Sequence, residues 1–333
     1  MKIFLKKYWL ILIIAFIINL PILLICCIRT DKTVTLKGDT TIIEKFVEVD
    51  REYEEKGSFS SIYVISFDHS TIFQNMILKN SNVSDVEDIY EGYLHFSNKE
   101  LNEMSKIQHE SSINYALICA YEEAKKVNSS IIFDYEFECY KIAYYGIDSE
   151  FRIGDKIIGV NDVYAKDDFQ KFKEIFNSGV DSKDGQTEYI VIREDETIRI
   201  TNSVENMKIS GYSTYEIKEG TSPSYTVKKT NVGGPSGGLL QTLAIYNSLV
   251  DDDITKGLKI AGTGTINANG LVGAIGGIKQ KIYTANDDKM DIFLCPKANY
   301  EDALKAYNTI KNPKMKLYMV ETFYDALEVL KNA

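Results

Sequence analysis

A glycine-rich turn just before an apolar segment constrains this chain more than any other stretch of its sequence. Residues 231–240 read Asn-Val-Gly-Gly-Pro-Ser-Gly-Gly-Leu-Leu and place one serine, Ser236, in the turn. The apolar residues between Leu239 and Leu249 recur at nearly helical spacing, which predicts a helix that starts directly after the serine. Free backbone N–H groups at a helix N-terminus favour negative charge, so this serine is a candidate nucleophile whose attack would create an oxyanion.

A second glycine turn follows, and it ends in lysine. Residues 273–281 read Gly-Ala-Ile-Gly-Gly-Ile-Lys-Gln-Lys. A lysine can take the proton of a serine if burial keeps its amine neutral. Lys279 and Lys281 stand two positions apart and would not share a helix face, so only one of them can reach the serine.

Three short motifs in this region resemble the proteolytic domain of the Lon family. Residues 234–238, Gly-Pro-Ser-Gly-Gly, match the family's serine turn, although alanine is usual at Gly237. Residues 263–266 match its Thr-Gly-x-Ile segment, and residues 276–281 match its Gly-Gly-apolar-Lys-x-Lys run. The motifs occur in the family's order, and the resemblance implies a protease.

The resemblance implies a Ser-Lys dyad in which Ser236 attacks the scissile carbonyl and Lys281 acts as the base. It leaves Lys279 solvated or structural. Thr263 is a candidate for holding the lysine amine by a hydrogen bond. Gly234 and Gly237 permit the tight turn, and the backbone N–H groups around Ser236 and Gly237 are candidates for stabilising the oxyanion.

The whole chain is similar to a membrane-anchored, ATP-independent subgroup that combines a PDZ-like domain with a Lon-type protease domain. That resemblance implies an α+β fold of mixed sheets with helices. Residues 57–130 would form the N-terminal part of the protease fold, residues 131–205 an inserted PDZ-like domain, and residues 206–333 the catalytic domain. A helix predicted over 99–127 would belong to the first part.

The predicted insert carries a pattern of its own. Residues 154–161, Gly-Asp-Lys-Ile-Ile-Gly-Val-Asn, resemble a PDZ strand and turn. A helix with phenylalanines on one face follows, and then a hairpin across Asp195. Such domains bind extended peptides by strand addition. A small β-rich spacer is the alternative, and no clear carboxylate-binding turn is present.

The N-terminus predicts a membrane anchor. Residues 8–28 form an uncharged segment that is long enough to span a bilayer, which requires roughly 20 apolar residues. Lysines at positions 2, 6 and 7 precede it. The positive-inside rule places the N-terminus in the cytoplasm and the catalytic domain outside the cell. We therefore predict a stub and transmembrane helix over 1–29, a stalk over 30–56 and a single-pass protein of the cell membrane.

Composition and motif content exclude several other classes of function. The net charge of −10, with scattered acidic residues, argues against nucleic acid as a partner. No phosphate-binding Gly-x-x-x-x-Gly-Lys-Ser/Thr sequence occurs, so we expect no nucleotide. The five cysteines show no metal-ligand spacing and are predicted to be core residues, so neither metal nor cofactor is expected. The three histidines all precede the insert in no recognisable motif, and we expect them at the surface or at helix ends.

The sequence thus predicts a membrane-anchored serine endopeptidase that cleaves exported peptides or unfolded proteins without ATP. The PDZ-like domain would select substrates, and the resemblance makes a homo-oligomer plausible. The alternative is an inactive Lon-like scaffold that binds peptides at the membrane without turnover.

Overall fold

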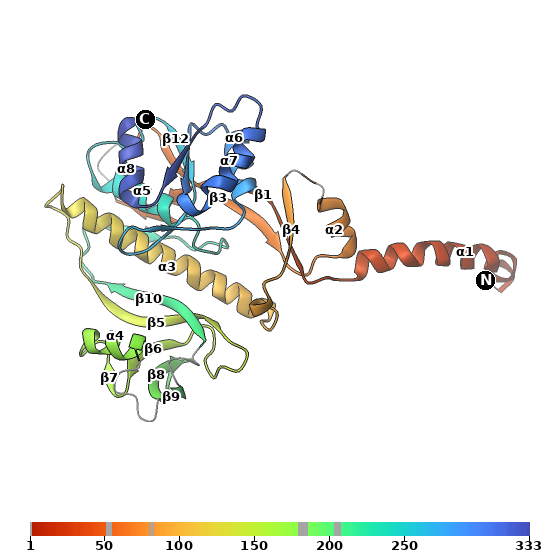
Figure 1. Ribbon diagram of the computed structural model, residues 1–333, viewed down its shortest axis with the longest axis horizontal. Coiled ribbons are helices and arrows are strands. Elements are labelled where there is room, and N and C mark those ends of the chain that lie inside the picture. The colour runs from red at the N-terminus through yellow and green to blue at the C-terminus, as the bar shows by residue number, and fades with distance from the viewer. Residues whose placement is uncertain (1, 51–54, 80, 82, 179–185, 203–207) are drawn as a thin grey trace.

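The computed structural model describes residues 2–50, 55–79, 81, 83–178, 186–202 and 208–333. Helix α1 (Lys2–Cys27) projects from the rest of the molecule (Figure 1). Its segment Tyr8–Cys27 has 20 residues, a mean hydropathy of 3.1 and no buried part. Among the described residues this is the one helix that is long and apolar enough to cross a membrane, in agreement with the predicted anchor.

The body is built on a six-stranded mixed sheet. Its order is β16 (Lys316–Val320), β15 (Ile292–Pro296), β12 (Lys259–Gly262), β3 (Ser58–Phe67), β1 (Lys32–Ile42) and β4 (Ser84–Asp88). Strand β3 pairs in parallel with β12 on one side and antiparallel with β1 on the other. The sheet therefore joins strands from the beginning and the end of the chain.

Helices cover both faces of this sheet. Alternate strand residues point to opposite faces, as Ile260 and Ala261 do in β12. One face packs against α3 (Asn98–Lys125), α5 (Gly238–Leu249) and α8 (Phe323–Asn332), and the other against α6 (Ile278–Asp287) and α7 (Tyr300–Thr309). Figure 1 shows α5 and α8 on one side of β12 and β3, with α6 and α7 on the other. The predicted mixed α/β layer is confirmed.

The stalk predicted for residues 30–56 is wrong for most of that segment. Residues 32–42 form β1, which pairs with both β3 and β4. Strand β2 (Val47–Val49) pairs with β11 (Tyr225–Val227), and Ile43 and Phe46 are buried in the main core. The threonines and charges suggested a solvated segment, but threonine favours strands, and the strands that pair with β1 and β2 are not visible in the segment's own residues.

A second sheet forms a separate β-rich unit. Its order is β10 (Ile209–Ile217), β5 (Tyr135–Tyr145), β6 (Lys156–Val160), β8 (Thr187–Arg193) and β9 (Glu196–Asn202), with β7 (Val163–Tyr164) beside β6. Helix α4 (Phe169–Ser178) packs Phe172 and Ile175 into its own core. The predicted helix and the hairpin across Asp195 are confirmed. The predicted boundary at residue 205 falls too early, because β10 completes this sheet by pairing with β5.

Local signals in the sequence fix several helix ends. Ser97 and Glu100 form a capping box at the start of α3, and Thr322 and Asp325 form one at the start of α8. Strands β13 (Thr265–Ile266) and β14 (Val272–Gly273) form a short hairpin. A short helix, α2 (Ile72–Leu78), lies between β3 and β4. The cysteines at positions 119, 139 and 295 are buried, as predicted, but the prediction of a core position is wrong for Cys26 and Cys27, which are exposed on α1.

Candidate active site

Ser236 lies immediately before α5, as the sequence predicts. The helix begins at Gly238 with Gly237 as its N-cap. Leu239, Leu240 and Leu243 are completely buried in the main core, so packing fixes the direction and start of the helix. The predicted helix after the serine is therefore confirmed, and the core positions the serine.

Hydrogen bonds from two sides hold the turn that carries Ser236. On the sheet side, the N–H of Gly264 and the hydroxyl of Thr263 both donate to the Ser236 carbonyl, at 2.8 and 3.0 Å. On the other side, the hydroxyl of Ser112 in α3 donates to the Pro235 carbonyl at 3.1 Å. The Ser236 backbone is thus bonded on one side to β12 and its extension and tied on the other to α3.

The glycines of the turn have distinct reasons to be there. Gly234 adopts a φ of +81°, which glycine tolerates better than any other residue, and its N–H donates to the Ser105 carbonyl at 2.9 Å. A side chain at Gly233 would place its Cβ 2.1 Å from the Ser105 hydroxyl. The Gly234 N–H is therefore engaged with α3. Within the described residues, the N–H groups of Ser236 and Gly237 have no such partner and remain candidates for an oxyanion.

Lys281 reaches Ser236 from the second glycine turn. Gly277, at a φ of +69°, is the N-cap of α6 and directs the first turn of that helix toward the sheet. The Nζ of Lys281 lies 2.8 Å from the Ser236 Oγ and 3.0 Å from the Thr263 Oγ1. The structure thus brings together the three residues that the sequence singled out.

The surroundings of Lys281 are apolar. Its side chain is 1% exposed and lies on the face of the sheet where Ala261, Ile278 and Ile282 pack. Among the described residues it forms no ion pair. Burial lowers the pKa of Lys281 to about 7, so a large fraction of the amine is neutral at neutral pH.

Part of this chain is similar to known proteins. Residues 206–333 match the family model of the Lon protease (S16) C-terminal proteolytic domain. The Lon protease of Campylobacter jejuni is 32% identical over 121 residues, which are 36% of this chain and 14% of that protein. The Lon protease of Campylobacter concisus is 36% identical over 100 residues, or 30% and 12%. The peroxisomal Lon protease homolog 2 of Kluyveromyces lactis is 32% identical over 99 residues, or 30% and 10%.

The chain therefore spans only a small part of the length of these relatives. The domain match implies a serine peptidase. Strand β3 and helix α3 precede residue 206, yet both pack in the same core as α5 of the Lon-type domain. The matched region thus depends on earlier residues to complete its sheet and to hold its serine turn.

Lys279 has a different role from Lys281. Its Nζ lies 2.8 Å from the Asp85 carboxylate and 3.2 Å from the Ser84 carbonyl, so it ties α6 to β4. The neighbouring Gln280 amide also donates to Asp85, at 2.8 Å. Only one of the two lysines contacts Ser236, in agreement with the helix argument.

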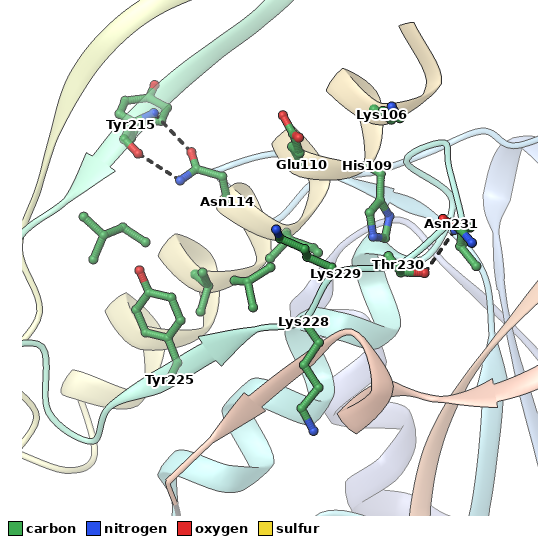
Figure 2. Close-up of a pocket in the computed structure, with 15 residues that line it drawn as sticks. Lys106, His109, Glu110, Asn114, Tyr215, Tyr225, Lys228, Lys229, Thr230 and Asn231 are labelled. Atoms are coloured by element: carbon green, nitrogen blue, oxygen red, sulfur yellow. Dashed lines mark hydrogen bonds between the residues drawn. The ribbon is translucent and has the colours of Figure 1, made fainter. Parts of the chain in front are cut away.

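Sequence reasoning missed the part that α3 plays in the Lon-type site. His109 was expected at a surface or a helix end, and this expectation is wrong. Its ring packs edge-on against Phe46, and the residue is 8% exposed. Figure 2 shows the His109 side chain directed from α3 toward the segment of residues 228–231. Burial lowers the pKa of His109, and a hydrogen bond to the Gly234 backbone partly opposes that shift. Its spacing from Ile113 and Leu117 on one helix face was the signal that could have predicted a buried position.

Proposed function

We propose that this chain is a serine endopeptidase in which Ser236 is the nucleophile and Lys281 is the general base. The observation that carries the proposal is the 2.8 Å contact between the Ser236 Oγ and the Nζ of a lysine that has no counter-ion among the described residues. A cationic lysine could not accept a proton, so the lowered pKa of Lys281 gives this contact its chemical meaning.

The reaction follows from these positions. Neutral Lys281 takes the Ser236 proton as the serine oxygen attacks the scissile carbonyl. The negative charge on the carbonyl oxygen meets the N–H groups at the start of α5. As the C–N bond breaks, the ammonium of Lys281 returns its proton to the leaving amine and an acyl-enzyme remains. Water then attacks the ester with Lys281 again as base, and Ser236 is restored.

Thr263 orients the base in this scheme. Its hydroxyl donates to the Ser236 carbonyl at 3.0 Å, so its oxygen is free to accept a hydrogen from the Lys281 amine at 3.0 Å. With one N–H directed at Thr263, the lone pair of the neutral amine can face the Ser236 hydroxyl. Thr263 is a positioning residue that does not exchange protons with the substrate.

The other parts of the molecule support a membrane-anchored enzyme. Helix α1 anchors the chain with its N-terminus in the cytoplasm, and the catalytic domain acts outside on exported peptides or unfolded proteins. The β-rich unit is PDZ-like and selects substrates. No ATP is used, and copies of the chain assemble as a homo-oligomer.

Hydrolysis of an unstructured protein tests the proposal. The full chain in detergent and its Ser236→Ala variant are incubated with the substrate, and the fragments are read by mass spectrometry. We expect fragments only from the unaltered chain. Identical fragments from both proteins would refute Ser236 as the nucleophile, and no fragments from either would favour a tethered peptide-binding scaffold.

A protease added outside intact cells tests the topology. It should degrade the catalytic domain and leave a short N-terminal stub. Protection until the cells are lysed would refute the extracellular placement.

A further inference from the structure

A groove of about 720 Å³ lies between α3 and the chain segment that leads to Ser236. Figure 2 shows α3 along one side and β11 with residues 228–231 along the other. The segment that leads to Ser236 lines the groove up to Val232. The next two residues, Gly233 and Gly234, contact Ser105 of α3. Its volume is within the roughly 300–1,000 Å³ typical of ligand sites.

One wall of the groove is a strand edge without a partner. Strand β11 pairs with β2, and the residues whose backbone bonds face β2 are Ser224, Thr226 and Lys228. Hydrogen-bonded positions alternate along an antiparallel pair, so Tyr225, Val227 and Lys229 direct their backbone groups to the other edge. All three line the groove, and within the described chain none makes a backbone hydrogen bond across that edge. This edge can accept an added strand.

On the other side of the groove, the backbone of Tyr215 in β10 already has hydrogen-bond partners. The Asn114 side chain accepts from the Tyr215 N–H at 3.2 Å and donates to the Tyr215 carbonyl at 2.9 Å (Figure 2). An extended segment in the groove therefore has β11 available as its backbone partner.

Two lysines that line the groove, Lys106 and Lys229, are exposed, and neither forms an ion pair among the described residues. The nearby Lys228 is paired with Glu48 at 2.5 Å, and Glu110 is paired with Lys141 at 3.2 Å. In a chain with a net charge of −10, two unpaired cations at one groove are a local exception that favours acidic side chains.

We propose that the groove binds an extended, acidic segment of the substrate by strand addition to β11. The segment lies against the apolar floor at Ile113 and Leu117, and Lys106 and Lys229 contact its carboxylates. The inference rests on the proposed peptidase function and names the substrate class. Strand β11 continues directly into the serine turn, so a segment bound there is delivered toward Ser236.

Peptide binding to the full-length Ser236→Ala protein tests the groove without any need for turnover. Fluorescence anisotropy compares labelled peptides of one sequence that carry glutamate, glutamine or lysine at the variable positions. We expect the glutamate peptide to bind best. The double variant Lys106→Gln/Lys229→Gln should reduce that preference by about tenfold, which corresponds to about 1.4 kcal/mol for two exposed ion pairs together. Lys228→Gln is the matched control and should change the preference much less.

Ester substitution in the peptide tests strand addition directly. Replacing one amide at a time by an ester removes single N–H donors, and only every second peptide group of an added strand faces β11. We expect weaker binding at alternate positions. No charge preference, an equal effect of Lys228→Gln, or no alternation would overturn the proposal. If the peptide binds with the expected pattern but the unaltered chain does not cleave it, the proposed peptidase function is refuted and the proposed binding in the groove is kept.

A different observation carries a second inference, which concerns α2. This helix is fastened to the end of α1, because the Ile72 N–H donates to the Ile28 carbonyl at 3.2 Å and the Thr30 N–H to the Ser70 carbonyl at 2.9 Å. Figure 1 shows α2 beside that end of α1. The side chains of Phe73, Met76 and Ile77 share one face of α2 and are 46%, 63% and 57% exposed.

The geometry points to the bilayer surface as the partner of this face. The apolar segment of α1 ends at Cys27, so a bilayer that contains it ends where α2 begins. A short helix with an apolar face at that depth lies in the interface, and the exposed Arg29 and Lys79 meet lipid headgroups. This inference rests on the proposed membrane anchor.

Lipid quenching separates the two membrane claims. The full chain, with Cys26 and Cys27 replaced by alanine, is placed in nanodiscs of phosphatidylcholine and phosphatidylglycerol with brominated acyl chains. Trp9, the only tryptophan, reports on α1, and a fluorophore at Met76→Cys reports on α2. A fluorophore at Val127→Cys, which is 67% exposed on the body, is the control.

We expect quenching of Trp9 and of the label at position 76, but not of the label at position 127. Quenching of Trp9 alone would overturn the placement of α2. If Trp9 itself is not quenched, the anchor and the placement of α2 both fail.

Discussion

The β-rich unit and the six-stranded sheet with its covering helices, here called the catalytic layer, each bury an ionisable side chain. The two side chains differ in their polar partners. In the β-rich unit, Asp155 is 1% exposed and accepts hydrogen bonds from Arg193 at 2.8 and 2.6 Å and from the Arg152 N–H at 2.8 Å. In the catalytic layer, Lys281 is equally buried, and its polar partners among the described residues are two hydroxyl groups. Within the part of the chain that the structure describes, Asp155 therefore has a counter-ion and Lys281 does not.

This difference shows how one chain separates structure from reactivity. A buried charge with a partner on each oxygen keeps its charge and joins two strands. A buried amine without a counter-ion is destabilised in its charged form, so it loses its proton near neutral pH. Burying Lys281 thus costs the catalytic layer some stability, and in the proposed mechanism it provides the base.

Replacing the unpaired amine should have the largest effect. Lys281→Met removes the base and should reduce cleavage of an unstructured protein by about 10⁴-fold or more, in line with the loss of an essential proton acceptor. Lys281→Arg should be equally inactive, because guanidinium stays protonated. Lys279→Met is the matched control and should keep most of the activity. Near-normal cleavage by Lys281→Met would show that the two buried charges do not differ in function.

The stability of the catalytic layer should depend on pH through the same residue. The pKa of Lys281 is about 7 in the folded chain and near the ordinary 10.5 when unfolded. Between these values the unfolded chain binds more protons, so the free energy of unfolding should rise with pH, by up to about 5 kcal/mol in all. Below this window the cost of burial is fully present.

Urea unfolding of the unaltered chain and of Lys281→Met at several pH values measures this effect. The difference between their unfolding free energies should change across the window, with Lys281→Met relatively more stable at low pH. A constant difference would mean that the amine is not held neutral by the fold.

Removing the counter-ion in the β-rich unit should have a smaller effect. Asp155→Ala leaves Arg193 without its partner and should destabilise that unit by about 2–3 kcal/mol, because Arg193 is partly solvated. Asp162→Asn breaks the exposed pair with Arg199 and keeps a side chain that tolerates the positive φ of this residue, so it should cost much less. Urea unfolding measures both. Equal losses would show that the burial of Asp155 is not what matters.

The pH dependence of the rate should show the smallest effect. The value of kcat/KM should rise about tenfold per pH unit at low pH and level off above about pH 7, as Lys281 loses its proton. The rate on a short unstructured peptide, measured from pH 5.5 to 9, checks this. A flat profile would argue against lysine as the base.

The sequence predicted which residues lie together at the candidate site better than it predicted the architecture around them. Ser236, Lys281 and Thr263 lie in short motifs whose glycines fix the local turns, so local reading sufficed. Strand β1 was taken for a stalk because its pairing with β3 is not visible in its own residues. Strand β10 extends the β-rich unit past residue 205 for the same reason. The burial of His109 was missed because the residue that packs against its ring, Phe46, lies in a distant part of the sequence.

The place of β3 at the centre of the sheet determines when the catalytic layer can assemble. Its neighbour β12 belongs to the last third of the chain, whereas β3 belongs to the first. During synthesis one edge of β3 stays without its partner β12 until the whole β-rich unit has been made. Pairing between strands so distant in sequence also forms late in folding. Ser236 and Lys281 also arrive after that unit. Under the proposed mechanism, a chain that is still being synthesised therefore lacks an assembled nucleophile and base and cannot yet cleave neighbouring nascent chains.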